Sequence, residues 1–416
     1  MFQGSVLFAI SQGLVLLVLT HFGGKIETGK YVLATSVTAP IFMLFELMLR
    51  VTRATDHQYG EQFRNYLGLR ATCLLLAFVT TIIVGIVFYR VEFWIIFAIL
   101  IYRMGDSLSN LSFGGFQRMQ ASDQVGKSLT IKAIIAIFLS TFVAWISGGS
   151  AFMVAIAMAS IACVWGTAWD LPKSWALNEP DLPLNLGQVR ASIADYKSNF
   201  RIAKRALPLG FDAFISSLAM NMPKYFIDHY FGKAALGVFG LLSQLALAVQ
   251  LLIGAVGHTG VGMLAARFQS GDRVGYWRLF NKMLASSIVV GILAIVVGTI
   301  VFPPVLGYFL GPTHNDAMLI MCLLIASCLV GAQRTAGRAT QASGSYLWYM
   351  TFDIVNFVTS VICSYFLIEK YGLIGGACVL IATFGAGLLV TLLHTYGISW
   401  RADQRAMRSA ETAVES

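Results

Sequence analysis

The chain has 416 residues, of which 57% are hydrophobic and 12% charged, with a mean hydropathy of +0.74 and a net charge of +9. Soluble proteins carry about 25% charged residues, so this composition excludes an ordinary water-soluble domain and a disordered chain. It predicts an all-α polytopic membrane protein, because apolar runs of about 20 residues cross a bilayer as helices.

Twelve apolar runs are long enough to cross a bilayer. They lie at roughly 5–21, 31–49, 71–89, 93–115, 128–146, 151–168, 207–230, 234–256, 283–302, 317–333, 347–368 and 372–396. An even number of spans places both termini on one side of the membrane. The six cysteines fall inside these runs and the six histidines are scattered, without the spacing of a metal site. We therefore expect no disulfide framework, no metal and no cofactor.

Lysine and arginine residues are distributed unevenly between the two sides of this topology. Loops on the side of the termini carry 21 of the 29 basic residues, the opposite loops carry five, and three lie inside spans. Because basic loops stay on the cytoplasmic side, this distribution predicts that both termini are cytoplasmic. It also assigns the positive charge to topology and not to nucleic-acid binding.

The longest predicted cytoplasmic loop lies near the middle of the chain. Val189, Ile193, Tyr196 and Phe200 share one face of a helix, with basic residues beside them. This pattern predicts an amphipathic helix on the anionic cytoplasmic leaflet; a solvated linker helix is the alternative. The expected organisation is a six-helix lobe at 1–169, a cytoplasmic linker at 170–205, a second six-helix lobe at 206–400 and a cytoplasmic tail at 401–416.

An internal repeat lies on either side of the linker. The residues 21–25 (HFGGK) match 229–233 (HYFGK) at an offset of 208, and the same offset pairs Gly29 with Gly237. Farther along, QAS at 120–122 recurs at 341–343. Six spans per copy return the chain to the same side, so the copies are predicted to be parallel and related by an axis along the membrane normal.

Polar residues recur on one face of four predicted spans. Span four aligns Arg103, Asp106, Asn110 and Gln117, with Arg103 and Asp106 close enough to pair. The other stripes are Glu46 with Arg53 in span two (with a bend expected at Pro40), Asn221, Lys224 and Asp228 in span seven (with a kink expected at Pro223), and Asp353 with Asn356 in span eleven.

A charge near the bilayer centre costs about 2.5 kcal/mol or more, so each charged side chain must face protein or water. The four stripes therefore predict a hydrated cavity between the two lobes. The alternative is a set of buried hydrogen bonds that hold helices together, with basic side chains near span ends reaching to the interface.

Several segments resemble one transporter family. They are ALPLG at 206–210, NMPKY at 221–225, GVFG at 237–240, and the opening hairpin from Gly29 to Arg50, Arg53 and Asp56. Together with span number and order, they resemble the polysaccharide-transporter (Wzx-type O-antigen flippase) family. That family belongs to the multidrug/oligosaccharidyl-lipid/polysaccharide (MOP) exporter superfamily, which also holds the multidrug (MATE) extruders and the lipid II flippase.

The resemblance implies a MATE-like fold with two lobes around a central cavity, in the bacterial inner membrane. It implies a flippase, not an enzyme, that carries undecaprenyl-pyrophosphate-linked oligosaccharide across the bilayer by alternating access. A polysaccharide polymerase and a chain-length regulator are candidate partners, and nucleic acid is not. The longest predicted external loop, 303–316, is too short for an external catalytic domain, which also speaks against an enzyme.

The resemblance and the polar stripes together nominate the site residues. Basic residues would neutralise the pyrophosphate: Arg50, Arg53, Arg103 and Lys224. Amides would bind the sugars: Asn110, Gln117, Asn221 and Asn356. Acids would line the cavity or couple transport to an ion: Glu46, Asp106, Asp228 and Asp353. An ion-coupled exporter of small molecules or drugs, with the same fold, is the alternative function.

Overall fold

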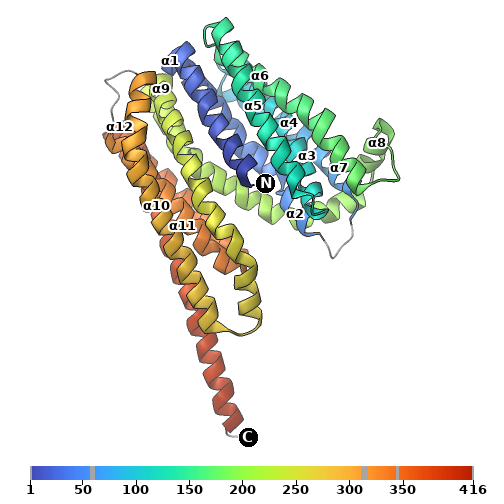
Figure 1. The fold of residues 1–416 in the computed structure, drawn as a ribbon, viewed down its shortest axis with the longest axis vertical. Helices are drawn as coiled ribbons and strands as arrows, with labels where there is room; N and C mark the ends of the chain where they lie inside the picture. The colour runs from blue at the N-terminus through green and yellow to red at the C-terminus, as the bar shows by residue number, and fades with distance from the viewer. Residues whose placement is uncertain (1, 57–60, 311–316, 343–345, 415–416) are drawn as a thin grey trace. The chain divides into compact units, whose positions relative to one another are not determined.

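The computed structural model describes residues 2–56, 61–310, 317–342 and 346–414, and every regular element in these ranges is a helix. In chain order they are α1 (Phe2–Glu46), α2 (Leu49–Thr55), α3 (Phe63–Phe88), α4 (Phe93–Arg118), α5 (Ser122–Ser147), α6 (Ala151–Trp165), a π-helix (Gly166–Asp170), α7 (Leu171–Asn178), α8 (Leu186–Ala194), α9 (Tyr196–Gln269), α10 (Arg273–Leu310), α11 (Ala317–Ala342) and α12 (Tyr346–Val414) (Figure 1). The predicted all-α fold class is confirmed.

Each of the twelve predicted spans coincides with one of these helices over most of its length. Three helices contain two spans apiece, and each of the three is broken at a glycine with positive φ: Gly24 in α1, Gly232 in α9 and Gly372 in α12. Seven segments of the described chain are long and apolar enough to cross a membrane, some of them long enough for two crossings. The helices are consistent with the predicted twelve spans.

The chain forms two compact units. One comprises Met1–Leu245 with Leu306–His314, and the other comprises Ala246–Val305 with Asn315–Ser416. In the first unit α1 packs against α5, and α4 packs against α6; in the second, α11 packs against α12. The boundary between the units falls inside α9, whereas the sequence predicts a lobe boundary in the linker, so the two six-helix lobes stay a prediction.

The internal repeat has a structural counterpart at its kink glycines. Gly24 has φ 75° and ψ −177°, and Gly232, at the predicted offset, has φ 74° and ψ −174°. Because residues with a Cβ rarely adopt these angles, glycine is required at both positions. A Cβ at Gly29 would overlap the carbonyl oxygen of Lys233, and a Cβ at Gly237 would overlap that of Lys25. These two contacts are equivalent under the same offset, which supports the predicted duplication.

The predicted course of span two needs a correction. The helix ends at Glu46, because Leu47 and Met48 adopt left-handed angles (φ 51° and 49°), and α2 begins at Leu49. Glu46 and Arg53 therefore belong to different helices and do not form one stripe. The backbone keeps helical angles through Pro40 and Pro223, and the breaks inside α1 and α9 fall at the glycines.

The linker also differs from the single amphipathic helix that the sequence predicts. The predicted face is divided between α8 and the start of α9, because Asp195 leaves helical geometry with ψ 64°. The Asp195 carboxylate accepts a hydrogen bond from the backbone N–H of Ser198 at 3.3 Å, so it caps the beginning of α9. Tyr196 and Phe200 are exposed there, whereas Val189 packs against the hydrophobic cluster around Phe63.

Candidate functional site

Arg50 on α2 is held by two carboxamides of α4. Its Nε donates to the side-chain oxygen of Gln117 at 3.3 Å, and its Nη1 donates to that of Asn110 at 3.4 Å. The Asn110 amide nitrogen in turn donates to the Glu46 carboxylate at 3.1 Å. These four residues form a connected group, named here the Arg50 group, and the sequence nominated all four.

Two neighbouring residues of α4 shape the place where Arg50 lies. Gly114 has no side chain, and a Cβ there would lie 2.7 Å from the Arg50 carbonyl oxygen, so the glycine lets α2 approach α4. The Arg50 guanidinium lies 5.3 Å from the centre of the Phe113 ring, within the range of a cation–π interaction. Asp106 and Glu46 are the carboxylates that act on the Arg50 charge.

Two further nominated cations, Arg103 and Lys224, lie in the same unit and close to each other. Arg103 Nη2 donates to the Thr35 carbonyl oxygen of α1 at 3.4 Å. Lys224 Nζ donates to the Asn221 side-chain oxygen at 3.0 Å. The two positive charges interact electrostatically, and both side chains are partly buried. Asn221 itself is bound through its amide nitrogen to the Ser217 carbonyl oxygen at 2.8 Å.

The pairing of Arg103 with Asp106 that the sequence allows does not form. Within the described chain no ion pair within 4.0 Å joins them, because Arg103 extends toward Thr35 on α1. The spacing of three residues permits such a pair on one helix, but a carbonyl on the neighbouring helix takes the guanidinium instead.

Arg53 lies apart from the Arg50 group, in a buried position. Its side chain donates to the Glu61 carbonyl oxygen at 2.5 Å and to the Asn178 side-chain oxygen at 2.8 Å. Its guanidinium also lies 5.3 Å from the centre of the Tyr66 ring and 5.7 Å from that of the Phe63 ring. With 2% of the residue exposed, Arg53 joins α2 to α3 and α7.

Asp228, nominated on the span-seven stripe, belongs to another cluster. Its carboxylate accepts from Lys233 Nζ at 2.7 Å, and the same nitrogen lies 3.2 Å from Glu92. This pair of contacts joins α9 to the segment just before α4. Asp228 therefore has an ion partner of its own, Lys233, and is not paired with Arg50, Arg103 or Lys224.

The remaining nominated residues, Asp353 and Asn356, belong to the second unit. Asn356 is buried, and its amide nitrogen donates to the Asp353 carboxylate at 3.1 Å. A Cβ at Gly387 would overlap the amide groups of Asn356 and Gln333, so the glycine makes room for them. These side chains form a polar cluster inside the apolar helices of that unit.

A buried ion pair between Lys132 and Asp170 was not predicted. Lys132 Nζ lies 3.2 Å from the Asp170 carboxylate, with 3% and 0% of the two side chains exposed. It also donates to Ser109 Oγ at 2.6 Å and lies 5.3 Å from the Phe113 ring centre, on the ring that Arg50 also contacts. The sequence placed Lys132 inside span five but assigned Asp170 to the linker, because the π-helix that continues α6 to Asp170 has no clear sequence signal.

The chemistry of these groups is that of binding. Among the described residues no cluster of histidine, cysteine, aspartate or glutamate could hold a metal ion, and the six cysteines are free thiols. The Arg50 group instead offers guanidinium donors beside amide groups, a combination that suits an anion carrying hydroxyl groups.

Similar proteins are found by sequence and by structure, although no protein-family model matches the chain. The chain is 23% identical over 385 residues to the capsular polysaccharide biosynthesis protein CapF of Staphylococcus aureus, covering 91% of this chain and 93% of that protein.

Three solved structures show a similar fold at low sequence identity. The lipid II flippase MurJ, in an inward closed conformation, matches with a TM-score of 0.72 and 13% identity over 94% of this chain and 87% of its own. The MATE multidrug transporter DinF-BH matches with a TM-score of 0.67 and 14% identity over 96% and 93%. An inward-facing MATE transporter of the MOP superfamily matches with a TM-score of 0.64 and 12% identity over 97% and 94%.

These likenesses extend over nearly the whole chain and agree with the predicted resemblance. The chain is a multi-pass membrane protein with the fold of MurJ and the MATE transporters, and it has a homologue among capsular polysaccharide biosynthesis proteins.

Proposed function

We propose that this protein is a flippase that moves a pyrophosphate-linked polyprenyl oligosaccharide from the cytoplasmic to the outer leaflet, for the synthesis of a surface polysaccharide. The transporter fold and the similarity to CapF support transport in polysaccharide biosynthesis. The Arg50 group supports an anionic, hydroxyl-bearing substrate. Bacterial inner membrane, cytoplasmic termini and alternating access belong to the same proposal, as do a polymerase and a chain-length regulator as partners.

The observation that carries the proposal is the way Arg50 is held. Two neutral amides and an aromatic ring fix its guanidinium, and no carboxylate of the described chain lies at hydrogen-bonding distance from it. A cation inside a membrane protein is costly to bury, and such residues mark substrate or ion pathways. An oriented guanidinium can bind a pyrophosphate oxygen in a charge-assisted hydrogen bond of about 1.5–3 kcal/mol.

The nominated residues receive distinct roles in this proposal. Arg50 binds the headgroup first, Arg103 binds it farther along α4, and Lys224 binds it nearer the outer side. Asn110, Gln117, Asn221 and Asn356 bind the sugars. Arg53 holds the α2 segment in place, because its donors are already engaged within the protein. Glu46, Asp106, Asp228 and Asp353 are the candidate coupling acids.

Transport in cells tests the proposal. A strain lacking the gene should accumulate lipid-linked saccharide on the inner leaflet, and the wild-type gene should relieve this. We expect Arg103→Ala to relieve it poorly and Arg103→Glu not at all, because the second change places a negative charge against the headgroup. The control is Arg278→Ala on the exposed surface of α10. Full activity of both Arg103 variants would refute the assigned role of Arg103.

A second function, ion-coupled export of small molecules, is favoured by one particular residue. Asp106 is a partly buried carboxylate on the polar face of α4, and such an acid suits a cationic drug or a coupling proton. The MATE structures with the same fold are multidrug transporters. Susceptibility to cationic drugs in the deletion strain separates the two functions, because the flippase proposal expects no change.

A further inference from the structure

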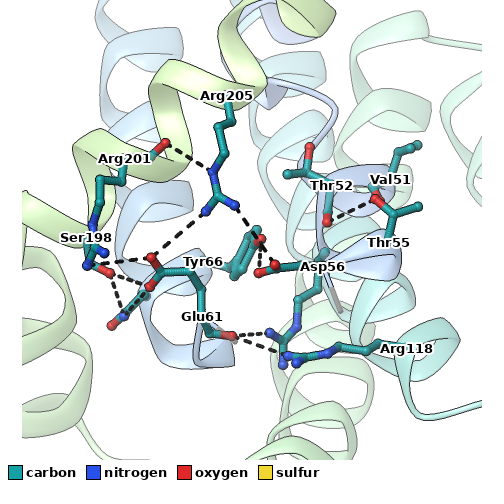
Figure 2. Close-up of polar contacts among 12 residues, drawn as sticks. Val51, Thr52, Thr55, Asp56, Glu61, Tyr66, Arg118, Ser198, Arg201 and Arg205 are labelled. Carbon is teal, nitrogen blue, oxygen red and sulfur yellow. Dashed lines mark hydrogen bonds and ion pairs between the residues drawn. The ribbon is translucent and has the colours of Figure 1, made fainter. Parts of the chain in front are cut away.

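A second group of arginines lies where the start of α9 meets the residue that follows α2 and the residues that precede α3. Arg201 and Arg205, on the first turns of α9, face two carboxylates, Asp56 and Glu61 (Figure 2). Arg201 Nη2 lies 3.6 Å from Glu61, while Arg205 lies 3.9 Å from Glu61 and 4.0 Å from Asp56. These four residues are named here the cytoplasmic arginine cluster.

Each of the two carboxylates has a neutral donor close to it. Ser198 Oγ donates to Glu61 at 2.6 Å, and the Tyr66 hydroxyl donates to Asp56 at 2.8 Å. The arginine contacts are longer by about an ångström. Each arginine is thus attracted to a carboxylate on which an uncharged group holds a closer position.

The surroundings of the cluster carry an excess of positive charge. Besides Arg201 and Arg205, the guanidinium groups of Arg53 and Arg118 donate to the backbone carbonyl oxygen of Glu61, at 2.5 and 3.3 Å. With Glu179, whose charge also acts on Arg53, four guanidinium groups face three carboxylates. The positive field at this place is not cancelled by the acids that are present.

The arginines are reachable and the acids are not. The Arg201 and Arg205 side chains are 69% and 28% exposed, whereas those of Glu61 and Asp56 are 8% and 2% exposed. An anion arriving from solution meets the guanidinium groups first. Planar guanidinium groups bind phosphate oxygens in paired hydrogen bonds. A carboxylate that already accepts a hydrogen bond from serine or tyrosine is a weaker partner for the same arginine.

We propose that Arg201 and Arg205 form a binding site for a phosphate or pyrophosphate group, and that the bound anion displaces Glu61 and Asp56 as the partner of these arginines. The ligand is a phosphate-type anion, either the headgroup of a membrane lipid or a free anion of the cytoplasm. A role for this site in the transport of a lipid headgroup rests on the proposed function, whereas the binding of the anion does not.

If the anion displaces the acids, removing an acid should increase the affinity for the anion. If the cluster only holds α9 against α3, removing an acid weakens this contact and does not increase the affinity for an anion. If the acids compete with an anion, removing one strengthens anion binding. Glu61→Gln keeps an oxygen that can accept from Ser198, so it removes charge with little change in the hydrogen bonds.

Binding of inorganic pyrophosphate to the purified full-length protein tests the site, by calorimetry at low salt. We expect Glu61→Gln to tighten binding about fivefold, the effect of losing one competing charge. The double variant Arg201→Gln with Arg205→Gln should weaken binding at least about tenfold. The matched control removes two exposed basic groups nearby, Arg190→Gln with Lys197→Gln, and should have a much smaller effect.

Three outcomes would refute the proposed binding site. They are unchanged or weaker binding in Glu61→Gln, equal effects of the two double variants, and no binding to the wild type. Should Glu61→Gln fail to fold, Asp56→Asn replaces it with the same expected sign, because asparagine can still accept from Tyr66.

A second arm identifies the source of the anion. The same variants are titrated in lipid nanodiscs with a short polyprenyl pyrophosphate. A matching pattern in this arm assigns the site to a lipid headgroup, and a pattern confined to inorganic pyrophosphate assigns it to a free anion. Transport is measured in parallel: a protein that binds pyrophosphate but moves no lipid disproves the proposed function and leaves the site standing.

Discussion

Arg50 and Arg53 lie one helical turn apart on α2, but their surroundings give them different uses. Arg53 is enclosed by aromatic rings and engaged with Glu61 and Asn178. Arg50 is held by the neutral amides of Asn110 and Gln117. A neutral partner orients a guanidinium without neutralising it, so Arg50 keeps its charge, as the proposed anionic substrate requires.

The Lys132–Asp170 pair leads to a prediction at the same scale. Asp170→Asn leaves a buried lysine without its counter-charge, which typically costs about 3–5 kcal/mol. The double variant Lys132→Met with Asp170→Asn removes both charges and should recover most of that loss. Thermal unfolding of the purified protein measures both. Equal stability of the single variant and the wild type would mean that the pair contributes nothing to folding.

Sequence patterns located single charged residues better than their partners. Lys132 is recognisable because a lysine inside an apolar run is rare. Its partner lies 38 positions later, at the end of a π-helix, and helical periodicity cannot report a contact between two helices. For the same reason periodicity shows that Arg103 and Asp106 are close enough to pair, but it does not show that Arg103 donates to a carbonyl oxygen of α1.

At the scale of the element, the hairpin around Gly24 and the hairpin around Gly232 pack as equivalent partners. Gly29 faces the backbone of Lys233, and Gly237 faces the backbone of Lys25. Backbone approaches this close need glycine on both sides, in the same way as small residues at other membrane helix interfaces. The repeat therefore explains why two glycines separated by 208 positions in the sequence both allow a close backbone contact.

This packing predicts that Gly29→Ala and Gly237→Ala each destabilise the protein. The added methyl group would overlap a carbonyl oxygen, and overpacking of this kind costs about 1–3 kcal/mol. The melting temperature in detergent is the measurement. Gly397→Ala is the control, because open space surrounds that position. A loss of stability no greater than that of the control would show that the two hairpins do not pack in this way.

In the linker, helical periodicity predicts the apolar face but not the break between two helices. The face formed by Val189, Ile193, Tyr196 and Phe200 fits a single helix, and the pattern contains no proline or glycine to end it. The break comes from Asp195, whose carboxylate caps the next helix. Aspartate is common in helix caps, but a single aspartate in a polar segment is too frequent to predict a break.

At the scale of the whole molecule, composition and hydropathy predicted most of the architecture. The helical class and the match of every predicted span to a helix follow from runs of apolar residues, which bilayer thickness requires. The positions of the kinks and of the end of α1 were predicted less well from the sequence. Prolines at 40 and 223 keep helical angles, whereas Leu47 and Met48 turn the chain through a left-handed conformation that residues of this type seldom adopt.

The predicted membrane orientation can be tested by labelling. The distribution of basic residues places Ala194 in the cytoplasm and Lys370 outside, and both residues are exposed. A membrane-impermeant maleimide should label Lys370→Cys in intact cells and Ala194→Cys only after permeabilisation. The wild-type protein, whose six cysteines lie in apolar runs, is the control for background. The reverse labelling pattern would show that the termini lie outside.

The central claim is that oriented cations in the first unit carry an anionic lipid headgroup across the bilayer. Proteoliposomes that hold the purified protein and a short polyprenyl-pyrophosphate-linked saccharide measure this directly, through the fraction of saccharide that an added enzyme can reach. We expect the wild type to move the lipid, and Arg50→Ala to slow it at least about tenfold, as the loss of one charge-assisted hydrogen bond requires. Equal rates for the wild type, the Arg50→Ala variant and protein-free vesicles would contradict the account.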